Sequence, residues 1–386
     1  MPYLDWNATT PPLASVLEAM REAARDGWAN PSSIHAHGRA ARAHVEDARA
    51  AVADLAGVDP RDVILTSGGT EANNLAIRSA FAGASPGTLL TSQLEHPSVT
   101  RVAEALLAEG RARVRWIAVL PDGRIDIDDL AAAVSEADAG RPRLLTLQAV
   151  NHETGVLQPI EEALALARRH GVRVHVDAVQ GFGRLAHACV SGAGADTRSL
   201  AGHKIRGPKG IGALVTRVGV RIEAILLGGA QERGLRPGTL DPIAAAGLAV
   251  AARHAKEGAA RYASLAPLRD DLDRALLALP AAPTPVGTAA RAPHVTNLAW
   301  PGWIGAELVA ALDLEGLSVS SGSACSAGTI EPSPVVLAML GPRAASSSVR
   351  VSLGEETTRA DVAAAIAIFR TVTDRMSSRA DRSNRE

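Results

Sequence analysis

Apolar residues in the first two thirds of the chain follow two alternating spacings. RAARAHVEDARAAVADLAG (residues 39–57) and EEALALARRHG (residues 161–171) repeat apolar positions every three or four residues, which predicts amphipathic helices. Shorter apolar runs rich in valine, isoleucine and leucine lie between such segments and predict strands: DVILTS, TLLTS, VRWIAVL, RLLTLQAV and VRVHVDAV. Strands that alternate with helices of this length indicate a mainly parallel sheet covered by helices.

The pattern changes near residue 255. A long helical stretch, GTLDPIAAAGLAVAARHAKEGAARYASL, is followed by the proline-rich APTPVGTAARAPHV and then by mixed strands and helices. We therefore expect an α/β fold with two units. The larger unit spans residues 13–255, and the smaller α+β unit combines residues 1–12 with residues 256–386.

Composition and charge narrow the classes of partner. The 386 residues carry 40 basic and 41 acidic side chains, a net charge of -1, whereas general nucleic-acid or membrane-surface binders need a field of one sign. No apolar run reaches the roughly 18 residues that span a bilayer, and the first residues show no secretory signal. We expect a cytoplasmic protein with no direct nucleic-acid or membrane partner.

Lysine is rare in this sequence and therefore informative. Almost all of the positive charge is arginine, and the only lysines are Lys204, Lys209 and Lys256. A guanidinium group neither loses its proton nor forms an imine, so arginine cannot replace a lysine that acts covalently. If the protein uses a lysine in this way, there are three candidates.

Lys204 is the candidate with a catalytic setting. The segment SLAGHKIRGPKG places it on a glycine-flanked turn after a short apolar strand. A desolvated lysine near other cations becomes nucleophilic enough to form a Schiff base. Lys209 has the features of a turn cation, and Lys256 those of a solvated charge on a helix.

Two glycines mark a candidate anion site. Ser-Gly-Gly-Thr-Glu at residues 67–71 follows a predicted strand and opens a predicted helix, so that free backbone N–H groups and the Thr70 hydroxyl face any anion at the helix start. A Gly-Gly turn between strand and helix is more often only a turn. No Gly-Lys-Ser/Thr follows, which excludes a nucleotide P-loop.

A carboxylate and a thiol complete the candidate chemistry. Asp177 ends the apolar strand in VRVHVDAVQGFG, where ligands of open α/β sheets bind, although a helix N-cap is the simpler interpretation of this residue alone. Cys325 lies in the Ser/Gly-rich SVSSGSACSAGTIEPSP, typical of an exposed loop that can carry a nucleophile. Cys189, between Ala188 and Val190, fits a buried structural cysteine instead.

The ordered motifs resemble those of the NifS-like cysteine desulfurases, which belong to the class-V aminotransferases among the fold-type I pyridoxal-phosphate enzymes. The resemblance covers residues 3–370, and the long Ser-Gly-Ser-Ala-Cys segment is similar to the class with a long mobile cysteine loop. The motifs that carry it are YLDWNATTP, ANPSSIH, SGGTEANN, LEHPSV, NHETGVLQPI, VHVDAVQ, SLAGHKIRGPKG, ERGLRPGTLD, SSGSACSAGTIEPS and SSVRVSLG.

The resemblance implies a role for each matching residue and implies no metal ion. Lys204 would bind pyridoxal 5'-phosphate covalently, and Arg350 would bind the substrate carboxylate as a bidentate pair. Without the resemblance to the family, we would interpret Arg350 as part of a surface ion pair and His96 as a surface histidine with its hydrogen bonds satisfied. The remaining implied contacts are Asp177 with the pyridine nitrogen, Gln180 with the ring hydroxyl, His96 stacked on the ring, Gly69, Thr70 and His203 with the phosphate, and Thr239 with the phosphate of a partner subunit.

Two positions depart from the family pattern. A serine that contacts phosphate is expected two residues before His203, and the sequence has Ala201 there, with Ser199 nearby but offset. The lost hydrogen bond corresponds to about 1.5–3 kcal/mol of cofactor affinity. His152 replaces an asparagine expected to face the cofactor; an imidazole N–H can donate a similar hydrogen bond but can also titrate.

The reaction implied by the resemblance is removal of sulfur from L-cysteine. L-Alanine is released, and Cys325 carries the sulfur as a persulfide to an acceptor protein, either an iron–sulfur scaffold or a carrier in a thio-modification pathway. The resemblance also implies a homodimer. A selenocysteine lyase or a dedicated thio-modification desulfurase fits the same motifs. An aminotransferase or epimerase would not need Cys325, and an inactive sulfur-transfer scaffold draws support only from Ala201 and His152.

Overall fold

The computed structural model describes residues 1–83, 85–136, 140–141, 143–186, 194–322 and 332–383. Within that part of the chain, a seven-stranded sheet has the order β1-β7-β6-β5-β4-β2-β3. β7 runs antiparallel to both of its neighbours, and the other pairs are parallel. The strands are β1 (Val63–Thr66), β2 (Gly87–Ser92), β3 (Ala112–Ile117), β4 (Arg143–Gln148), β5 (Arg173–Asp177), β6 (Thr197–Ala201) and β7 (Gly212–Thr216).

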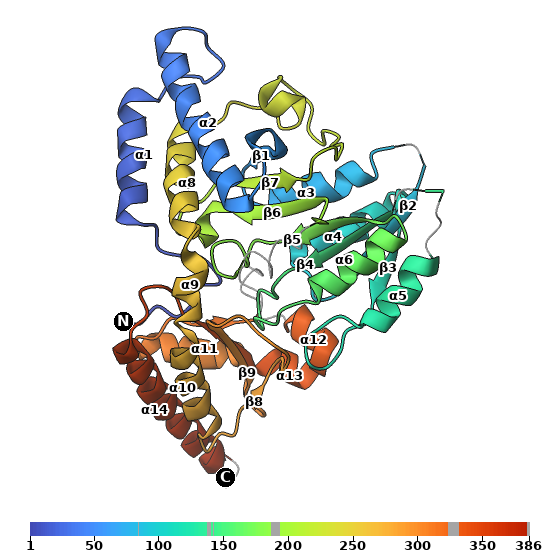
Figure 1. Ribbon diagram of the computed structural model, residues 1–386. Helices are drawn as coiled ribbons and strands as arrows, with labels where there is room; N and C mark the ends of the chain where they lie inside the picture. The colour runs from blue at the N-terminus through green and yellow to red at the C-terminus, as the bar shows by residue number, and fades with distance from the viewer. Residues whose placement is uncertain (84, 137–139, 142, 187–193, 323–331, 384–386) are drawn as a thin grey trace.

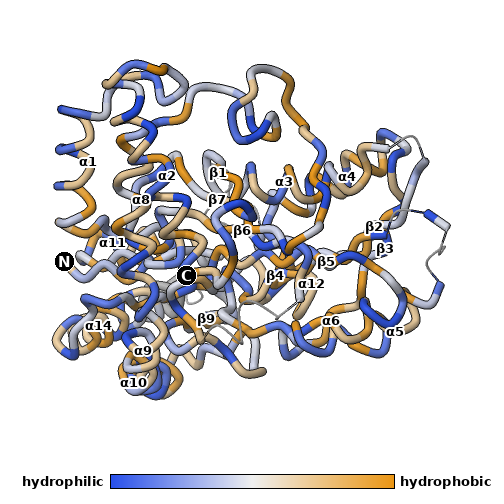
Figure 2. The backbone as a smooth tube through the Cα atoms, turned by 45° about the horizontal axis from the view of Figure 1, so that its top comes forward, coloured by the Kyte–Doolittle hydropathy of each residue, from blue (hydrophilic) through white to orange (hydrophobic). Residues whose placement is uncertain are grey.

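Helices cover the large sheet in pairs. α3 (Gly69–Ala80) and α4 (Pro97–Ala108) contact each other and the sheet, and so do α5 (Ile127–Glu136) and α6 (Ile160–Arg169). Figure 2 shows α3 and α4 on one side of the strands and α5 and α6 on the other, with hydrophilic and hydrophobic residues alternating along α5 and α6. This alternation lets each helix bury one face on the sheet.

Three helices pack together at the β1 end of the molecule. α1 (Ala14–Asp26) and α2 (Ala36–Ala56) both contact α8 (Pro242–Ala255), and the three lie side by side in Figure 1. In the described residues the larger body also contains the short 3-10 turns η1 (Pro60–Asp62), η3 (Gly202–Lys204) and η4 (Gln231–Gly234).

A second, antiparallel sheet of four strands in the described residues has the order β10-β11-β9-β8. Its own apolar cluster includes Leu298, Trp300, Val351 and Phe369. The strands are β8 (Thr284–Pro285), β9 (Val295–Ala299), β10 (Ser320–Ser321) and β11 (Ser348–Ser352), and the helices around them are α9 (Gly258–Ala263), α10 (Ala266–Leu277), α11 (Gly305–Leu314), α12 (Pro334–Leu340), α13 (Pro342–Ser347) and α14 (Arg359–Ser383).

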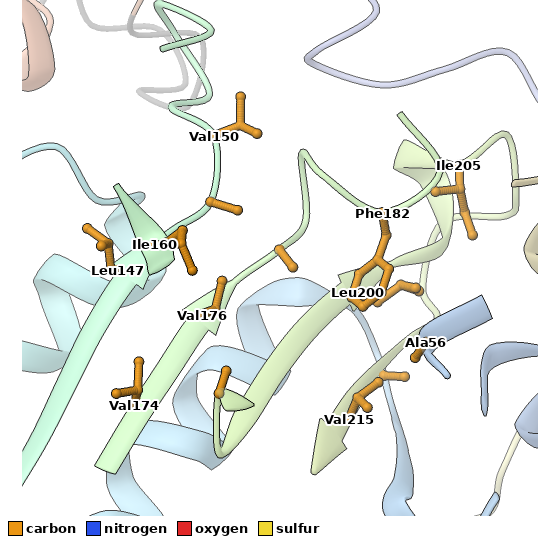
Figure 3. Packing of buried hydrophobic residues seen from close by; sticks show 14 of the residues in the cluster. Ala56, Leu147, Val150, Ile160, Val174, Val176, Phe182, Leu200, Ile205 and Val215 are labelled. Carbon is orange, nitrogen blue, oxygen red and sulfur yellow. The ribbon is translucent and has the colours of Figure 1, made fainter. Parts of the chain in front are cut away.

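The main core lies on the large sheet. Val174 and Val176 of β5, Leu147 of β4 and Leu200 of β6 are all buried, and Figure 3 shows them with Phe182 among the packed side chains. Burying an aliphatic side chain of this size stabilises the fold by about 1.5–3 kcal/mol. The central strands are buried on both faces, and β5 ends in a polar residue, Asp177, at the edge of the sheet where ligands bind.

The first ten residues run between the two sheets. Tyr3 forms a bridge with Ser318 and Asp5 forms one with Ser352, both beside the small sheet. A few residues later, Thr10 N–H donates to the carbonyl of His203 at the end of β6 (3.1 Å). The amino-terminal segment, residues 3–10, therefore connects the small sheet with the turn that follows β6.

The elements expected from the apolar spacing are confirmed, with two differences. The strands predicted by DVILTS and VRVHVDAV are β1 and β5, and the helix predicted over residues 39–57 is α2. The stretch after residue 238 forms two helices, α8 and α9, with Lys256 as the cap between them. In addition, β7 turns the end of the sheet antiparallel. None of the helices in the described part is long and apolar enough to cross a membrane.

Candidate active site

The glycine pair joins β1 to the start of α3. Gly68 has φ +153°, and a Cβ on Gly69 would lie 2.6 Å from Val179 Cγ2 and 3.7 Å from the Cβ of Ala201. The missing side chain lets the helix start approach both the turn after β5 and the end of β6. Thr70 is exposed at this helix start. The predicted anion site therefore lies beside Ala201, the position where a serine was expected.

Asp177 ends β5 and is 7% exposed. Its Oδ1 accepts hydrogen bonds from the Ser199 hydroxyl (3.0 Å) and from Val179 N–H (3.1 Å), and its Oδ2 accepts one from Asn73 Nδ2 (2.8 Å). The bond from Val179 is the local cap that the simpler interpretation expects, but the other two come from β6 and α3. Three donors thus fix the carboxylate at the strand end.

Lys204 lies on the tight turn η3. Gly202 N–H donates to the carbonyl of Ile211 (2.9 Å), and Gly207 N–H donates to the carbonyl of Gly202 (2.9 Å). A Cβ at Gly202 would lie 2.9 Å from the Pro208 carbonyl oxygen, so the turn requires glycine there. The flanking glycines that singled out Lys204 in the sequence therefore shape its turn.

The Lys204 amine points at the amino-terminal segment. Its Nζ donates to the carbonyl oxygens of Asn7 and of Ala8, the latter at 2.8 Å. Lys209, in contrast, is exposed, and Lys256 pairs with Asp54 at 2.8 Å, with more than half of each side chain exposed. Of the three lysines, only Lys204 is partly buried among other candidate residues.

A fully buried arginine fixes this arrangement. Arg184, 1% exposed, donates from Nη1 to Asn7 Oδ1 (2.9 Å) and Gln180 Oε1 (2.5 Å), and from Nη2 to the carbonyls of Trp6 (3.0 Å) and Lys204 (2.9 Å). Gln180 also donates from Nε2 to the carbonyl of Asn7 (3.0 Å). One guanidinium group thereby holds the amino-terminal segment against the lysine turn.

Two imidazoles lie within reach of the charge of Lys204. His96 caps the start of α4, and its ring lies 5.3 Å from that of His152 in an edge-on arrangement. Burial lowers the pKa of His96, and the charge of Lys204 lowers it further against the effect of Asp177. Burial also holds the pKa of His152 well below its ordinary value, followed by the charges of His96, Arg350 and Lys204. The charges of Lys204, Asp177 and Arg350 therefore act on the same pair of imidazoles, which indicates that these predicted residues lie close to one another.

Arg350 lies on β11 with its side chain 4% exposed. Its Nη2 pairs with Asp5 Oδ1 (2.6 Å), and its Nη1 donates to the carbonyl of His152 (3.0 Å). Its Nε is buried with no hydrogen-bond partner among the described residues. Arg350 thus forms an ion pair, as expected from its residue type, but the pair is buried and not on the surface. Its Nε remains as a donor for another acceptor.

Of the remaining predicted residues, one lies at this site and the others do not lie there or lie outside the described residues. His203 lies beside Lys204, and its Nδ1 is 3.1 Å from the Thr9 hydroxyl; burial, then the Lys204 charge, lowers the pKa of His203 to about 4. Thr239 is exposed on the loop after η4, and no hydrogen bond joins it to this site in the part of the chain described. Cys325 and Cys189 lie outside the described residues.

A cavity of about 420 Å³ opens beside the starts of α3 and α4, where Thr70, His96 and Ser98 line it. The cavity lies between α3 and α4 and adjoins the predicted site at Thr70 and His96, whereas Asp177, Ala201 and Lys204 are not among its lining residues. Anions are favoured at helix starts, and polar groups at the ends of parallel strands face the same edge.

Several residues at this site were not singled out from the sequence. Asp5, Asn7 and Arg184 carry no local signal, because their partners are distant in the chain. Asn73 lies within the SGGTEANN motif, and His175 precedes Asp177 by two residues on the same face of β5. The alternation of side chains along a strand would have indicated His175.

The chain is similar to known proteins over nearly its whole length. The family model described as Aminotransferase class-V matches residues 2–364. A cysteine desulfurase from a Nostoc species is 37% identical, with the match covering 97% of this chain and 93% of that protein. A solved structure titled "NIFS-LIKE PROTEIN" superposes with a TM-score of 0.88 at 29% identity, covering 97% of this chain and all of the other. A structure of SspA in complex with cysteine superposes with a TM-score of 0.77 at 30% identity, covering 93% of this chain and 100% of the other.

Proposed function

The chain belongs to the aminotransferase class-V family and is a cysteine desulfurase, and from that premise we propose that it binds pyridoxal 5'-phosphate through Lys204 and passes the sulfur of L-cysteine to Cys325. The observation that carries this proposal is the position of Lys204. It is the one lysine of three that lies beside a carboxylate at a strand end, two imidazoles and a buried arginine with an unpaired donor.

The residues present fit the cofactor. Asp177, fixed by three donors, can hold a protonated pyridine nitrogen. The start of α3 offers backbone N–H groups to the phosphate, and Gly69 lacks a side chain where one would fill the cradle. His96 would stack on the ring, while Thr70 and His203 would add phosphate contacts. Gln180 would contact the ring hydroxyl, and His152 replaces the amide that the family pattern expects beside the ring.

Arg350 fits the carboxylate of the substrate. Its unpartnered Nε and its Nη2 lie on the same edge of the guanidinium group, the geometry that binds a carboxylate through two hydrogen bonds. A buried donor without an acceptor destabilises the protein, and a bound carboxylate removes that penalty. Asp5 keeps the guanidinium group neutralised and oriented in the absence of substrate.

In this mechanism the bound cofactor supplies an electron sink for the pair released at the substrate Cα. The Lys204 amine takes and returns the Cα proton. Arg350 holds the carboxylate of the substrate, and the His96 imidazole lies close to Lys204.

The Cys325 thiolate attacks the substrate sulfur, so that an S–S bond forms as the Cβ–S bond breaks. The electron pair stays with carbon, which gains a proton, and cysteine becomes alanine. The sulfur is oxidised as the carbon is reduced, so the step needs no external oxidant. The persulfide would then pass to an iron–sulfur scaffold or a thio-modification carrier.

A homodimer would complete the site. Thr239 is exposed and forms no hydrogen bond with Lys204 among the described residues, which supports a role in the site of a second copy. Trp28, Ile34 and Leu227 are also exposed, at 64%, 87% and 95%, and such apolar side chains suit a subunit interface. Sedimentation of the full chain should give twice the monomer mass; a monomeric holoenzyme with full activity would contradict this.

We also propose that residues 13–255 form the cofactor-binding unit and that residues 1–12 and 256–386 form the small unit with the cysteine loop. Leu4 supports this division, because it packs in the apolar cluster of the small sheet. Val295 and Val336 pack with the core of the large sheet, so the two units share an apolar contact.

The two cysteines provide a matched test of the reaction. The full chain, loaded with pyridoxal phosphate, is incubated with L-cysteine and a reductant, and alanine and sulfide are quantified together. The wild type and Cys189→Ser should release both in equal amounts. Cys325→Ser should keep the visible absorbance of the bound cofactor and lose both products. Normal alanine output from Cys325→Ser would remove Cys325 from the mechanism.

A further inference from the structure

Asn73 occupies a junction that the roles described above do not explain. It lies on α3, is 1% exposed, and contacts three polar side chains from three other parts of the chain. Its Nδ2 lies 2.8 Å from Asp177 Oδ2 and 2.8 Å from Ser98 Oγ, and its Oδ1 lies 2.9 Å from His175 Nε2. One amide therefore connects the carboxylate at the end of β5 with the start of α4.

The direction of each hydrogen bond at Asn73 is determined. An ionised carboxylate only accepts, so the NH2 group must face Asp177 and the carbonyl must face His175. His175 must then carry its proton on Nε2. Burial lowers the pKa of His175 to about 4, which leaves the ring neutral, so that its Nδ1 accepts from the Thr197 hydroxyl at 2.9 Å.

Ser98 connects Asn73 with His96 and determines which nitrogen of the His96 ring carries the proton. The Ser98 hydroxyl accepts a hydrogen bond from Asn73, and its own proton points to His96 Nδ1 at 2.8 Å. Ser98 N–H donates to the same nitrogen at 3.1 Å, as part of the cap of α4. A nitrogen that accepts two hydrogen bonds carries no proton in the neutral ring. The proton of neutral His96 therefore lies on Nε2.

We propose that Asn73 is a positioning residue that sets two groups of the site at once, the orientation of the Asp177 carboxylate and, through Ser98, the Nε2–H tautomer of His96. The inference rests on the proposed function, because it assigns Asp177 to the cofactor and His96 to its ring face. In this tautomer the neutral His96 ring donates a hydrogen bond from Nε2, and its Nδ1 is already occupied by two donors. His96 therefore cannot take the substrate proton, and Lys204 removes it.

The amide group is suited to this position for a chemical reason. An amide forms strong hydrogen bonds with both neighbours but does not transfer a proton between them. Asp177 and His96 are thus connected without being able to neutralise each other. A carboxylate in place of Asn73 would face Asp177 with a like charge, and a titrating side chain would open a proton path.

The test uses the full chain with and without pyridoxal phosphate. Asn73→Ala removes the junction, Ser98→Ala removes only its connection to His96, and Asn30→Ala is the matched control, since it removes an exposed amide elsewhere. Long-range proton–nitrogen NMR spectra report the tautomer of each imidazole, and His96→Gln assigns the His96 signals.

In the cofactor-free wild type, His96 should show an unprotonated Nδ1 and a protonated Nε2. Asn73→Ala and Ser98→Ala should both change the Nδ1 shift, and Asn30→Ala should not. In the loaded enzyme, kcat for alanine formation should fall about tenfold in Asn73→Ala, the loss expected for one hydrogen bond to a charged group, while KM stays within about twofold.

A proton on Nδ1 of wild-type His96 would overturn the assignment, and so would an unchanged His96 spectrum in both variants. A changed spectrum with unchanged kcat would overturn the role in the reaction. If Asn73→Ala does not fold, Ser98→Ala decides by the same readouts. A wild type that binds no pyridoxal phosphate would instead refute the proposed function, and the cofactor-free spectra would still decide the hydrogen-bond assignment.

Discussion

Replacing Arg184 by methionine should destabilise the protein and weaken its hold on the cofactor. Methionine fills similar space but donates nothing, so four acceptors lose the Arg184 donor: the side-chain oxygens of Asn7 and Gln180 and the carbonyls of Trp6 and Lys204. Each buried acceptor left unpaired costs about 1–3 kcal/mol. Asn7 Oδ1 keeps His294 Nε2 as a partner at 3.1 Å, so the penalties of the other three acceptors set an upper limit of about 9 kcal/mol.

Two effects reduce that limit. Burial lowers the pKa of Arg184, which shows that the protein destabilises this cation, and methionine removes that unfavourable term. Water can also enter and satisfy some of the acceptors. We therefore expect a net loss of about 2–4 kcal/mol in the free energy of unfolding. Affinity for pyridoxal phosphate should fall as well, because Arg184 holds the lysine turn and the segment that its amine contacts.

Urea unfolding of the cofactor-free chain measures the first effect, and titration with pyridoxal phosphate measures the second. Arg21→Met is the matched control, because the Arg21 side chain is 62% exposed and pairs with Glu18 in the neighbouring turn of α1. Its free energy of unfolding should stay within about 0.5 kcal/mol of wild type. An Arg184→Met variant within about 1 kcal/mol of wild type would refute the reasoning from buried acceptors.

Three further predictions concern affinity, pH and substrate binding. Ala201→Ser should restore a phosphate donor beside Gly69 and tighten pyridoxal-phosphate binding by tenfold or more, about 1.5–3 kcal/mol in a fluorescence titration; unchanged affinity would place the phosphate elsewhere. Burial raises the pKa of Glu153 from 4.5 to about 7, so its contribution to stability is complete below pH 4.5 and is lost as the pH rises through 7. Glutamine does not titrate, so Glu153→Gln should gain about 2–3 kcal/mol relative to wild type between pH 5 and pH 8 in urea unfolding, and a pH-independent difference would contradict the raised pKa. Arg350→Lys should raise KM for cysteine by about tenfold or more, because lysine cannot form the two parallel hydrogen bonds; an unchanged KM in steady-state assays would exclude Arg350 from the substrate.

The spacing of apolar residues along the sequence was sufficient to predict most of the fold. The strands β1 and β5 and the helix α2 follow from apolar periodicity, which reflects burial on one face or two. The break between α8 and α9 was not predictable in this way. At Gly258, just after the break, a side chain would collide with the carbonyl of Gly183, a contact between segments 75 positions apart that periodicity does not encode.

The same difference between local and long-range features applies to the candidate site. Lys204 stood out because lysine is rare and glycines flank it, and both features are local. The pairing of Arg350 with Asp5 joins residues 345 positions apart, and Arg184 reaches Asn7 across 177 positions. Such partners depend on how the amino-terminal segment crosses between the sheets, and no short motif specifies that path.

The proposed reaction depends most on the chemistry of one amine. Borohydride reduction of the loaded protein, followed by peptide mapping, locates the lysine that holds pyridoxal phosphate. We predict that the label lies on Lys204 and that Lys209 and Lys256 stay unmodified. A label on either of those two lysines, or on none, would contradict the central claim.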